Sequence, residues 1–515
     1  MIDTCAPAYK NRCSSKSFLI RVLFSMVMAE NTIESYFSGA KVLVTGGTGF
    51  LGKLLVEKLL RVCRNLSKIY VVVRPKKGKT CEKRLEEYLE NQVFGRLTAK
   101  HPESLKKLVF VNGNCECPRL GLSNADIEML KSEINVVFHI AATVRFDEQL
   151  RKAVLINVRA TDDLLSIAKE MSALKSFVHV STAFSFCCQP KIEEEFYDVP
   201  ISSGQLLEII ESHNDDDLSK LTANICKPWP NTYVFTKAVA EDLIRRKAGD
   251  LPIAIVRPSI VLGTVEEPVP GWIDNLYGPT GLFIGTSLGL VRTIILEPNC
   301  IADQVPADFV VNNVIAASWG LQNKLHDHIP IYNCVSGPDN PITWEEAYTL
   351  SLHCAKNLPS KQMKWHVILK PTASASTFAF QHFFLHMVPA FVADLFLLIL
   401  GHKPKTVKSY NKILKNIMVV SYFTTKQWTF ANTSTKNLLK SLSVEDKARF
   451  NFDMESINWK TYAHTYVSGA RYYILGETLQ TVPEGVRKAF RLKLAHYFLL
   501  SVFFGGVLKF LLTLI

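Results

Sequence analysis

Two residues with the spacing of an acid–base pair stand near the middle of the chain. Tyr233 and Lys237 form the pattern Y-x-x-x-K, and one turn of a helix would place both side chains on the same face. A free tyrosine titrates near about 10, and a neighbouring ammonium group stabilises the phenolate and lowers that pKa. The pattern therefore predicts Tyr233 as a catalytic acid–base group and Lys237 as its partner.

Y-x-x-x-K alone is a weak signal, because the same pattern begins again at Tyr422. Position separates the two occurrences. Tyr233 follows an apolar, strand-like segment at 176–182, whose end offers the hydroxyl groups of Ser181 and Thr182. Tyr422 lies beyond the strand-rich part of the chain, and we assign it a structural role.

A glycine-rich turn near the N-terminus is typical of a nucleotide-binding site. The sequence TGGTGFLG lies between a strand pattern at 40–46 and a helical pattern at 50–63. Such glycines let backbone N–H groups approach a pyrophosphate, whose negative charge the helix N-terminus stabilises. The predicted dinucleotide loop comprises Gly46, Gly49, Phe50, Leu51 and Gly52.

The residue that ends the next strand pattern, 68–74, indicates which dinucleotide binds. Enzymes that use NAD usually place Asp or Glu here to hold the ribose 2′-hydroxyl, whereas this chain has Arg74, followed by Lys76 and Lys77. A cation suits a 2′-phosphate, so we predict NADPH as the cofactor. The alternative is that these cations form a solvated loop.

These residues require a sheet to position them. Further apolar strand patterns lie at 108–114, 135–142, 176–182 and 253–259, and helical patterns separate them. Alternating strands and helices predict an α/β fold, a Rossmann-type doubly wound parallel sheet, with a smaller mainly helical C-terminal domain. The expected division is an N-terminal extension at 1–33, a cofactor-binding domain at 34–345, a helical domain at 355–480 and a membrane anchor at 494–515.

The anchor is predicted from an apolar run at the C-terminus. Residues 494–515 are long enough to cross a bilayer and follow a basic cluster at 487–493. Lys509 lies near the end of the run, where a lysine can reach the interface. The alternative is a buried terminal helix.

Two other apolar runs need an interpretation. The segment 378–400 contains His382, His386 and Asp394, which favours helices packed in the core or lying on a membrane over a membrane span. The run 18–28 resembles a short signal peptide, but Arg21 interrupts it. We interpret the first residues as an extension that precedes a natural start at Met28.

The composition of the chain limits the kinds of molecule that it is expected to bind. The chain has 515 residues and a net charge of +12, which favours an anionic partner such as a membrane surface or a phosphorylated ligand. It shows no zinc-finger spacing and no RNA-binding motif, so we expect no nucleic acid and no metal site. The 12 cysteines are irregularly spaced, as in reduced cytosolic proteins.

Several longer motifs together resemble one enzyme family. TGGTGFLGK, VVVRPK, FHIAATVRFDE, VSTAF, VRPSIV, EPVPGWIDNLYGPTG and YNCVSGPDNPITW occur in this order and resemble the fatty acyl-CoA reductases, which belong to the extended short-chain dehydrogenase/reductase superfamily. The resemblance covers about residues 34–480. It implies a reductase domain followed by a helical "sterile"-type domain, and reduction of long-chain acyl-CoA to a primary alcohol with two NADPH.

The resemblance also implies roles for individual residues. It favours Thr182 over Ser181 as the catalytic hydroxyl, which would hydrogen-bond the thioester oxygen together with Tyr233, and no covalent nucleophile is needed. Lys237 would also hold ribose hydroxyls. Where family members often have Asp near the adenine, this chain has Asn114, and Ala141 and Thr143 are expected to line the nicotinamide ribose.

Location and product use follow from the same resemblance. It suggests the peroxisomal membrane, with the endoplasmic reticulum as the alternative, and an alcohol that feeds ether lipid or wax ester synthesis. The C-terminal position of the apolar run and the irregular cysteines predict that the catalytic domain faces the cytosol. A homo-oligomer is possible. Two rival interpretations are a hydroxysteroid dehydrogenase of the same superfamily and a non-enzymatic membrane scaffold.

Overall fold

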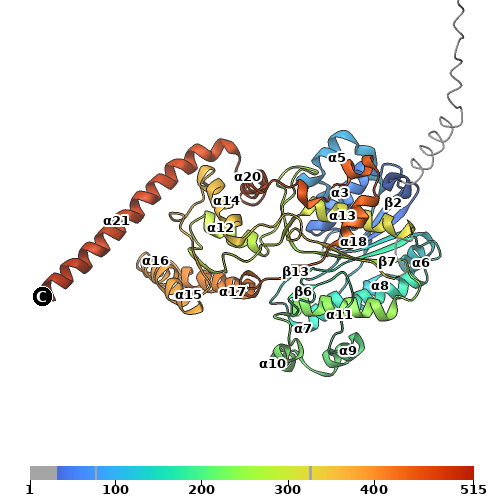
Figure 1. The fold of residues 1–515 in the computed structure, drawn as a ribbon, viewed down its shortest axis with the longest axis horizontal. Coiled ribbons are helices and arrows are strands. Elements are labelled where there is room, and N and C mark those ends of the chain that lie inside the picture. Colours follow the sequence, from blue (N-terminus) through green and yellow to red (C-terminus); the bar gives the residue numbers. More distant parts are fainter. Residues whose placement is uncertain (1–31, 76–77, 324–327, 515) are drawn as a thin grey trace, which may run out of the picture.

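A seven-stranded parallel sheet forms the centre of the computed structural model, which describes residues 32–75, 78–323 and 328–514 (Figure 1). The strand order is β11-β7-β5-β4-β1-β2-β3, so the chain winds outward from β1 in both directions. The order reverses between β1 and β4, and ligands of such folds bind beyond the carboxyl ends of the strands at this point. The strands are β1 (Lys41–Thr45), β2 (Lys68–Val73), β3 (Leu108–Asn112), β4 (Val136–His139), β5 (Ser176–Val180), β7 (Ile253–Pro258) and β11 (Ile331–Cys334).

The predicted doubly wound sheet is confirmed. Six of its seven strands lie within the apolar segments that the sequence predicted, because strands buried on both faces are almost continuously apolar. The seventh, β11, was not predicted. It is only four residues long, too short to be distinguished from a loop by its pattern.

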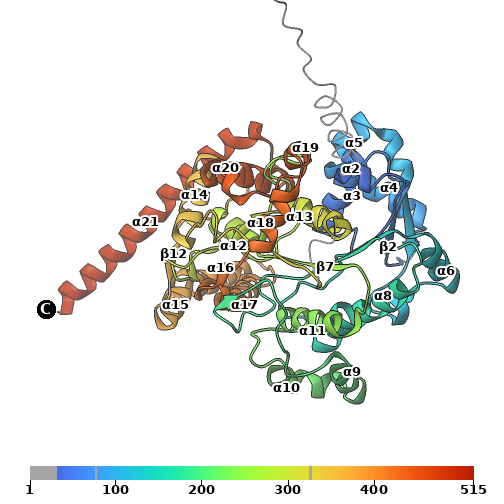
Figure 2. The same cartoon turned by 45° about the vertical axis from the view of Figure 1, so that its right-hand side comes forward.

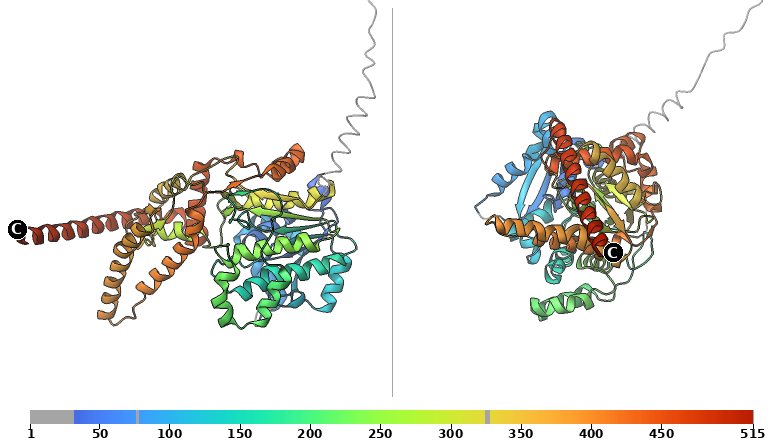
Figure 3. Two further views of the ribbon diagram at one scale, coloured as in Figure 1. Left: turned by 60° about the horizontal axis from the view of Figure 1, so that its bottom comes forward. Right: turned by 90° about the vertical axis from the view of Figure 1, so that its left-hand side faces the viewer.

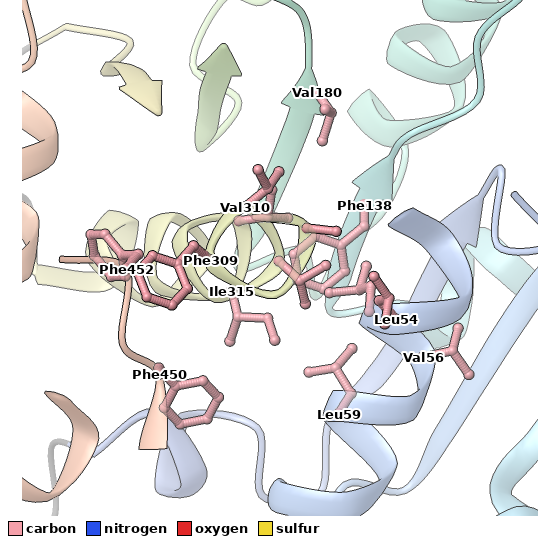
Figure 4. Packing of buried hydrophobic residues seen from close by; sticks show 14 of the residues in the cluster. Leu54, Val56, Leu59, Phe138, Val180, Phe309, Val310, Ile315, Phe450 and Phe452 are labelled. Carbon is pink, nitrogen blue, oxygen red and sulfur yellow. The ribbon is translucent and has the colours of Figure 1, made fainter. Parts of the chain in front are cut away.

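Helices cover both faces of this sheet. On one face, α3 (Phe50–Val62) and α13 (Ala307–Gly320) pack through a shared apolar cluster, in which Leu54 and Leu59 lie beside Ile315 (Figure 4). On the other face, α8 (Ala160–Lys169) and α11 (Thr232–Lys247) form a second cluster. The remaining helices of this part are α2 (Ile33–Tyr36), α4 (Cys81–Leu89), α5 (Gly95–Lys100), α6 (Asn124–Glu133), α7 (Leu150–Val154), α9 (Ser203–Ser212), α10 (Asp215–Ile225) and α12 (Pro279–Ser287).

The last third of the chain is mainly helical, as predicted (Figure 2). Its helices are α14 (Trp344–Asn357), α15 (Ala375–His382), the π-helical η6 (Phe383–Met387), α16 (Val388–Ile399), α17 (Thr406–Thr424), α18 (Thr433–Ser441), α19 (Val444–Arg449), α20 (Trp459–Gly469) and α21 (Val482–Leu514).

This helical part interlocks with the sheet domain. Strand β12 (Lys370–Thr372) pairs with β9 (Thr293–Ile295), and β13 (Thr429–Phe430) pairs with β6 (Lys191–Ile192). Within the sheet domain itself, a short pair joins β8 (Ile260–Leu262) to β10 (Gln304–Pro306). Phe450 and Phe452 belong to the same apolar cluster as α3 and α13 (Figure 4). The two parts therefore share a core, and the proposed domain boundaries stay a prediction.

The C-terminal helix α21 projects away from the body (Figure 3). Residues Leu479–Thr513 are long and apolar enough to cross a membrane, and none of their most apolar stretch is buried in the protein. The alternative of a buried terminal helix is therefore wrong, because within the described residues no protein surface covers the most apolar stretch of α21.

A second candidate span, Ala375–Ile399, has only 22% of its most apolar stretch buried. The expectation that this segment packs in the core is therefore wrong for most of it, whereas contact with a membrane stays a prediction. The predicted N-terminal extension, 1–33, with its signal-like run and the start at Met28, lies outside the described residues up to residue 31. Of its last two residues, Thr32 is the N-cap of α2 and Ile33 begins that helix, and Ile33 is buried in the same core as α3.

Candidate active site

All the residues predicted for the site line one cleft of about 850 Å³ at the carboxyl ends of the central strands. Helix α17 and the segment 274–279 add to its walls. The structure thus brings together residues from distant parts of the chain. They are Gly46, Gly49, Phe50, Leu51, Gly52, Arg74, Asn114, Ala141, Thr143, Thr182, Tyr233 and Lys237.

The glycine turn has the shape of a phosphate cradle. Gly46 has a φ of +75°, and a Cβ there would lie 2.6 Å from the backbone nitrogen of Ala141, so only glycine fits. Gly49 is the N-cap of α3 and provides no side-chain cap, which leaves the first backbone N–H groups of the helix available to a ligand. These features fit the pyrophosphate of a dinucleotide.

Two guanidinium groups lie at the β2 end of the cleft. Arg74 has a 69% exposed side chain, and its Nη1 lies 3.5 Å from Oε1 of Glu116. Arg84, on α4, donates a hydrogen bond to the carbonyl oxygen of Arg74 and also lines the cleft. Sequence analysis missed Arg84, because no motif links it to Arg74 before α4 folds back. Lys76 and Lys77 lie outside the described residues.

Replacing Arg74 with Glu is expected to raise the Kd for NADPH by about 10- to 100-fold, the range given by the loss of a hydrogen bond to a charged group. The carboxylate repels a 2′-phosphate but can accept a hydrogen bond from a 2′-hydroxyl, so the Kd for NADH should change little. Both constants can be measured by fluorescence titration. Arg96→Glu, on exposed α5 outside the cleft, is the matched charge control. If the Kd for NADPH and the Kd for NADH rose by the same factor, Arg74 would not bind the 2′-phosphate.

Asn114 follows β3 at the same end of the cleft. Its Oδ1 accepts a hydrogen bond from the backbone N–H of Glu116 at 3.1 Å, which shapes the turn below Arg74. The side chain thus stabilises this edge of the cleft, and its contact with the adenine stays a prediction.

The loop after β4 is held by a residue that sequence analysis missed. Asn157, buried in the π-helical turn η4 (Leu155–Arg159), accepts a hydrogen bond from the N–H of Thr143 at 2.9 Å. Its Nδ2 donates to Thr236 Oγ1 on α11, also at 2.9 Å. Asn157 therefore ties the loop that carries Ala141 and Thr143 to the helix that carries Tyr233. A single Asn within a helical pattern gives no sequence signal for this role.

The two neighbouring hydroxyl residues after β5 point in different directions. Ser181 donates to the buried carboxylate of Glu241, away from the reacting groups. Thr182 lines the cleft with Tyr233 and lowers the pKa of that phenol, and its Oγ1 donates a hydrogen bond to the carbonyl oxygen of Pro258 at 3.4 Å. The geometry therefore favours Thr182 as the hydroxyl that acts beside the tyrosine.

The pKa of Tyr233 differs from the value expected of a tyrosine beside an ammonium group. Burial raises the pKa of Tyr233 to about 12, although the neighbouring Thr182 hydroxyl lowers it. Lys237 does not lower it as predicted, because its Nζ instead donates to the carbonyl oxygen of Val180 at 2.7 Å. Burial lowers the pKa of Lys237 to about 8. Tyr233 is therefore a neutral phenol near pH 7 and can act as a hydrogen-bond donor and an acid.

The second Y-x-x-x-K pair makes structural contacts. Tyr422 donates a hydrogen bond to the carbonyl oxygen of Cys187 at 3.2 Å, and Lys426 Nζ lies 3.9 Å from the centre of the Tyr422 ring. Cys115 lines the cleft, but burial raises its pKa to about 11, so it is a neutral thiol rather than a nucleophile. In the described part of the chain, no group of His, Cys, Asp or Glu is placed to hold a metal.

Comparison with known proteins gives the family. Residues 44–314 match the NAD-binding domain of male sterility proteins, and residues 385–477 match their Sterile domain. The chain is 38% identical over 466 residues to fatty acyl-CoA reductase 1 of Rattus norvegicus, which covers 90% of each chain. The chain belongs to the fatty acyl-CoA reductase family. Fatty acyl-CoA reductase wat of Drosophila melanogaster is 36% identical over 483 residues, with 94% of this chain and 93% of the relative covered.

Solved structures show the same fold at lower identity. The terminal R domain of the myxalamid pathway is 19% identical with a TM-score of 0.56, over 84% of this chain and 91% of that one. The reductase domain of a nonribosomal peptide synthetase from Mycobacterium tuberculosis is 16% identical with a TM-score of 0.56, over 89% and 97%. Family membership makes this reductase an oxidoreductase with a nicotinamide-binding domain, so the scaffold interpretation is wrong. The hydroxysteroid dehydrogenase interpretation is wrong because the chain matches fatty acyl-CoA reductases over 90% of its length, including the Sterile domain.

Proposed function

We propose that the reductase converts a long-chain fatty acyl-CoA into the primary alcohol with two molecules of NADPH. The observation that carries this proposal is the pair of hydroxyl groups of Thr182 and Tyr233, which line the same cleft beside the glycine cradle. Two convergent donors suit a carbonyl oxygen on which negative charge develops. The two guanidinium groups of Arg74 and Arg84 favour the 2′-phosphate of NADPH.

The chain's own groups then have defined tasks. Bound NADPH supplies hydride to the carbonyl carbon in both reductions. In the first, the hydroxyls of Tyr233 and Thr182 donate to the thioester oxygen and stabilise its developing charge until CoA leaves as the thiolate. In the second, they hold the aldehyde oxygen, and Tyr233 gives its proton to the alkoxide. The high pKa of Tyr233 keeps that proton in place until it is needed.

The test is product analysis with the purified full-length protein. With palmitoyl-CoA and NADPH we expect hexadecanol as the product and two NADPH oxidised for each alcohol formed. Accumulation of the aldehyde with one NADPH oxidised would contradict the second reduction. The absence of NADPH oxidation with any acyl-CoA would contradict the proposed function.

The pH dependence of kcat/KM should reflect the protonation of Lys237. Because its pKa is lowered to about 8, the ammonium group loses its proton as the pH rises through that value, and kcat/KM should fall on the alkaline side. Tyr233, with a pKa of about 12, stays protonated over this range. Lys237→Arg should move the alkaline limb beyond about pH 10, because a guanidinium does not titrate there. If kcat/KM of the wild-type enzyme stayed constant up to about pH 10, the reaction would not need the protonated ammonium group of Lys237, which is expected to hold the ribose hydroxyls.

The proposal includes a location. Residues 494–515 would anchor the enzyme in the peroxisomal membrane, with the endoplasmic reticulum as the alternative, and the catalytic domain would face the cytosol. The exposed apolar surface of α21 and the basic residues at 487–493 support an anchor that meets anionic headgroups on the cytosolic side. The alcohol would feed ether lipid or wax ester synthesis.

Deletion of residues 494–515 should release the enzyme from membranes. After a carbonate wash, we expect the full-length chain in the pellet and the shortened chain in the supernatant, because α21 is the part that crosses the bilayer. Activity with detergent-dispersed acyl-CoA should persist and shows that the shortened chain is folded. A shortened chain that stays in the washed pellet would mean that another segment spans the membrane.

A further inference from the structure

The second candidate span is polar on its inside and apolar on its outside. Helices α15 and α16, with η6 between them, bury His382, His386 and Asp394, the residues that interrupt the apolar run. Their large apolar side chains point outward, and each of the following is at least 50% exposed: Phe380, Phe383, Phe384, Phe391, Leu395, Phe396, Leu398 and Ile399. A contiguous apolar surface of this size on a soluble protein marks an interaction site.

The buried polar residues fix α17 against this segment. Asp394 accepts hydrogen bonds from the backbone N–H groups of Lys405, Thr406 and Val407 at 2.8–3.0 Å, and so caps the start of α17. The ring of His386 stacks on Tyr410, one turn further along α17, with centroids 5.1 Å apart. We call residues 375–424, from α15 to the end of α17, the hairpin. Because these contacts join α17 to α15 and α16, the two sides of the hairpin must enter or cross a membrane together.

Helix α17 is not built to cross a bilayer. Lys408 and Lys412 are exposed one turn apart on the same face of α17, and a lysine at the centre of a bilayer is strongly disfavoured. Lys415, also exposed, forms an ion pair with Asp147 of the sheet domain at 2.9 Å. The C-terminal end of α17 contributes Phe423 and Thr424 to the catalytic cleft, which needs contact with a water-soluble cofactor. A span through α15 and α16 would draw these lysines into lipid, so the apolar surface contacts lipid in another way.

The directions in which the helices run indicate how this apolar surface contacts lipid. The hairpin and α21 leave the body on the same side, but they run in clearly different directions (Figure 3). If α21 crosses the bilayer, the hairpin can lie along its surface. Lys408 and Lys412 of α17, with Lys403 and Lys405 in the connecting turn, then meet headgroups while the aromatic side chains of α15 and α16 enter the acyl region.

We propose that the hairpin is an in-plane membrane surface for a bilayer with anionic headgroups, and that the acyl chain reaches the cleft from this bilayer past the C-terminal end of α17. The delivery step rests on the proposed function, whereas the membrane contact does not. The cleft wall formed by Val420 and Phe423 is apolar and belongs to the same helix that carries the lysines, so α17 joins the hairpin to the site.

Topology can be tested with the full-length chain in sealed vesicles of phosphatidylcholine and phosphatidylserine. Two single variants, His402→Cys in the turn and Phe396→Cys on the apolar surface, are treated with a membrane-impermeant maleimide, and labelling is read peptide by peptide. The exposed native Cys188 reports molecules whose catalytic domain faces outward.

We expect the thiol introduced in the turn to be labelled like Cys188, and the thiol introduced on the apolar surface to be protected. Labelling of the turn variant only after permeabilisation would show that the segment spans the membrane. Rapid labelling of the apolar-surface variant would show that this surface does not contact lipid. Either result overturns the proposal.

Delivery is tested with the double variant Leu395→Glu/Phe396→Glu, which places two carboxylates on the apolar surface. With palmitoyl-CoA in vesicles, kcat/KM should fall about tenfold, while activity with soluble hexanoyl-CoA is unchanged. Val444→Glu, at an exposed apolar position on α19, is the matched control and should behave as wild type (Figure 2). Unchanged activity of the double variant with both substrates would overturn the delivery step. A wild-type enzyme inactive with every acyl-CoA would instead overturn the proposed function and leave the labelling result standing.

Discussion

Replacing Tyr233 with phenylalanine is expected to lower kcat for alcohol formation by about 10²- to 10⁴-fold, the usual contribution of a general acid. The ring and its stacking on Phe146, with centroids 5.8 Å apart, are retained, and only the hydroxyl that contacts Thr182 is lost. The glycine turn and Arg74 are untouched, so the Kd for NADPH should change by less than about twofold. Single-turnover kinetics with saturating NADPH would separate the chemical step from binding.

Tyr422→Phe is the matched control, because it removes the same atom from the other Y-x-x-x-K pair. Its hydroxyl donates to the carbonyl oxygen of Cys187 and does not line the cleft, so kcat should stay near the wild-type value. If the Tyr233 variant kept more than about a tenth of wild-type kcat, Tyr233 would not be the acid.

Continuous apolar patterns made most of the sheet predictable. Each of the six predicted strands is buried on both faces, and β1 leads directly into the glycine turn, so the strand–turn–helix order identifies the cofactor loop. The sequence could not show that Phe450 packs against the same core as α3, because contacts between residues hundreds of positions apart follow from topology rather than from local pattern.

Within the site, the sequence predicted residue types but not their surroundings. Gly46, Thr182 and Tyr233 were found from motifs. Arg84 and Asn157 were missed, because each reaches the site through hydrogen bonds that no local sequence pattern reveals. The pKa of Tyr233 was predicted in the wrong direction, because spacing places Lys237 on the same helix but does not show that burial dominates or that its ammonium turns to a backbone carbonyl.

The hairpin shows why polar residues in an apolar segment are ambiguous. His386 and Asp394 were interpreted as interruptions that argue against a span. In the structure they face the protein, where Asp394 caps α17, and the outward surface is largely apolar. The sequence shows which polar residues such a helix contains. Whether these residues contact lipid or protein depends on which face of the helix packs against the rest of the chain, and the sequence does not show this.

A buried ion pair below the site carries the largest expected effect on stability. Arg257 on β7 and Glu241 on α11 are both fully buried, with Nη2 and Oε2 2.5 Å apart. The guanidinium also donates to the carbonyl oxygens of Glu193 and Glu195, each at 2.9 Å. Ser181 donates to the same carboxylate, so the pair fixes the residue next to Thr182.

Replacing Glu241 with Ala is expected to lower the free energy of unfolding by about 3–5 kcal/mol, because it leaves the Arg257 charge buried without its counter-ion. Urea unfolding followed by tryptophan fluorescence would measure the change. Lys247→Ala breaks a partly exposed pair with Asp162 on the surface of the same helix, and should cost at most about 1 kcal/mol. The double variant Glu241→Leu/Arg257→Met removes both charges and should recover much of the stability. Equal losses in the Glu241→Ala and Lys247→Ala variants would mean that the buried pair does not hold α11 to β7.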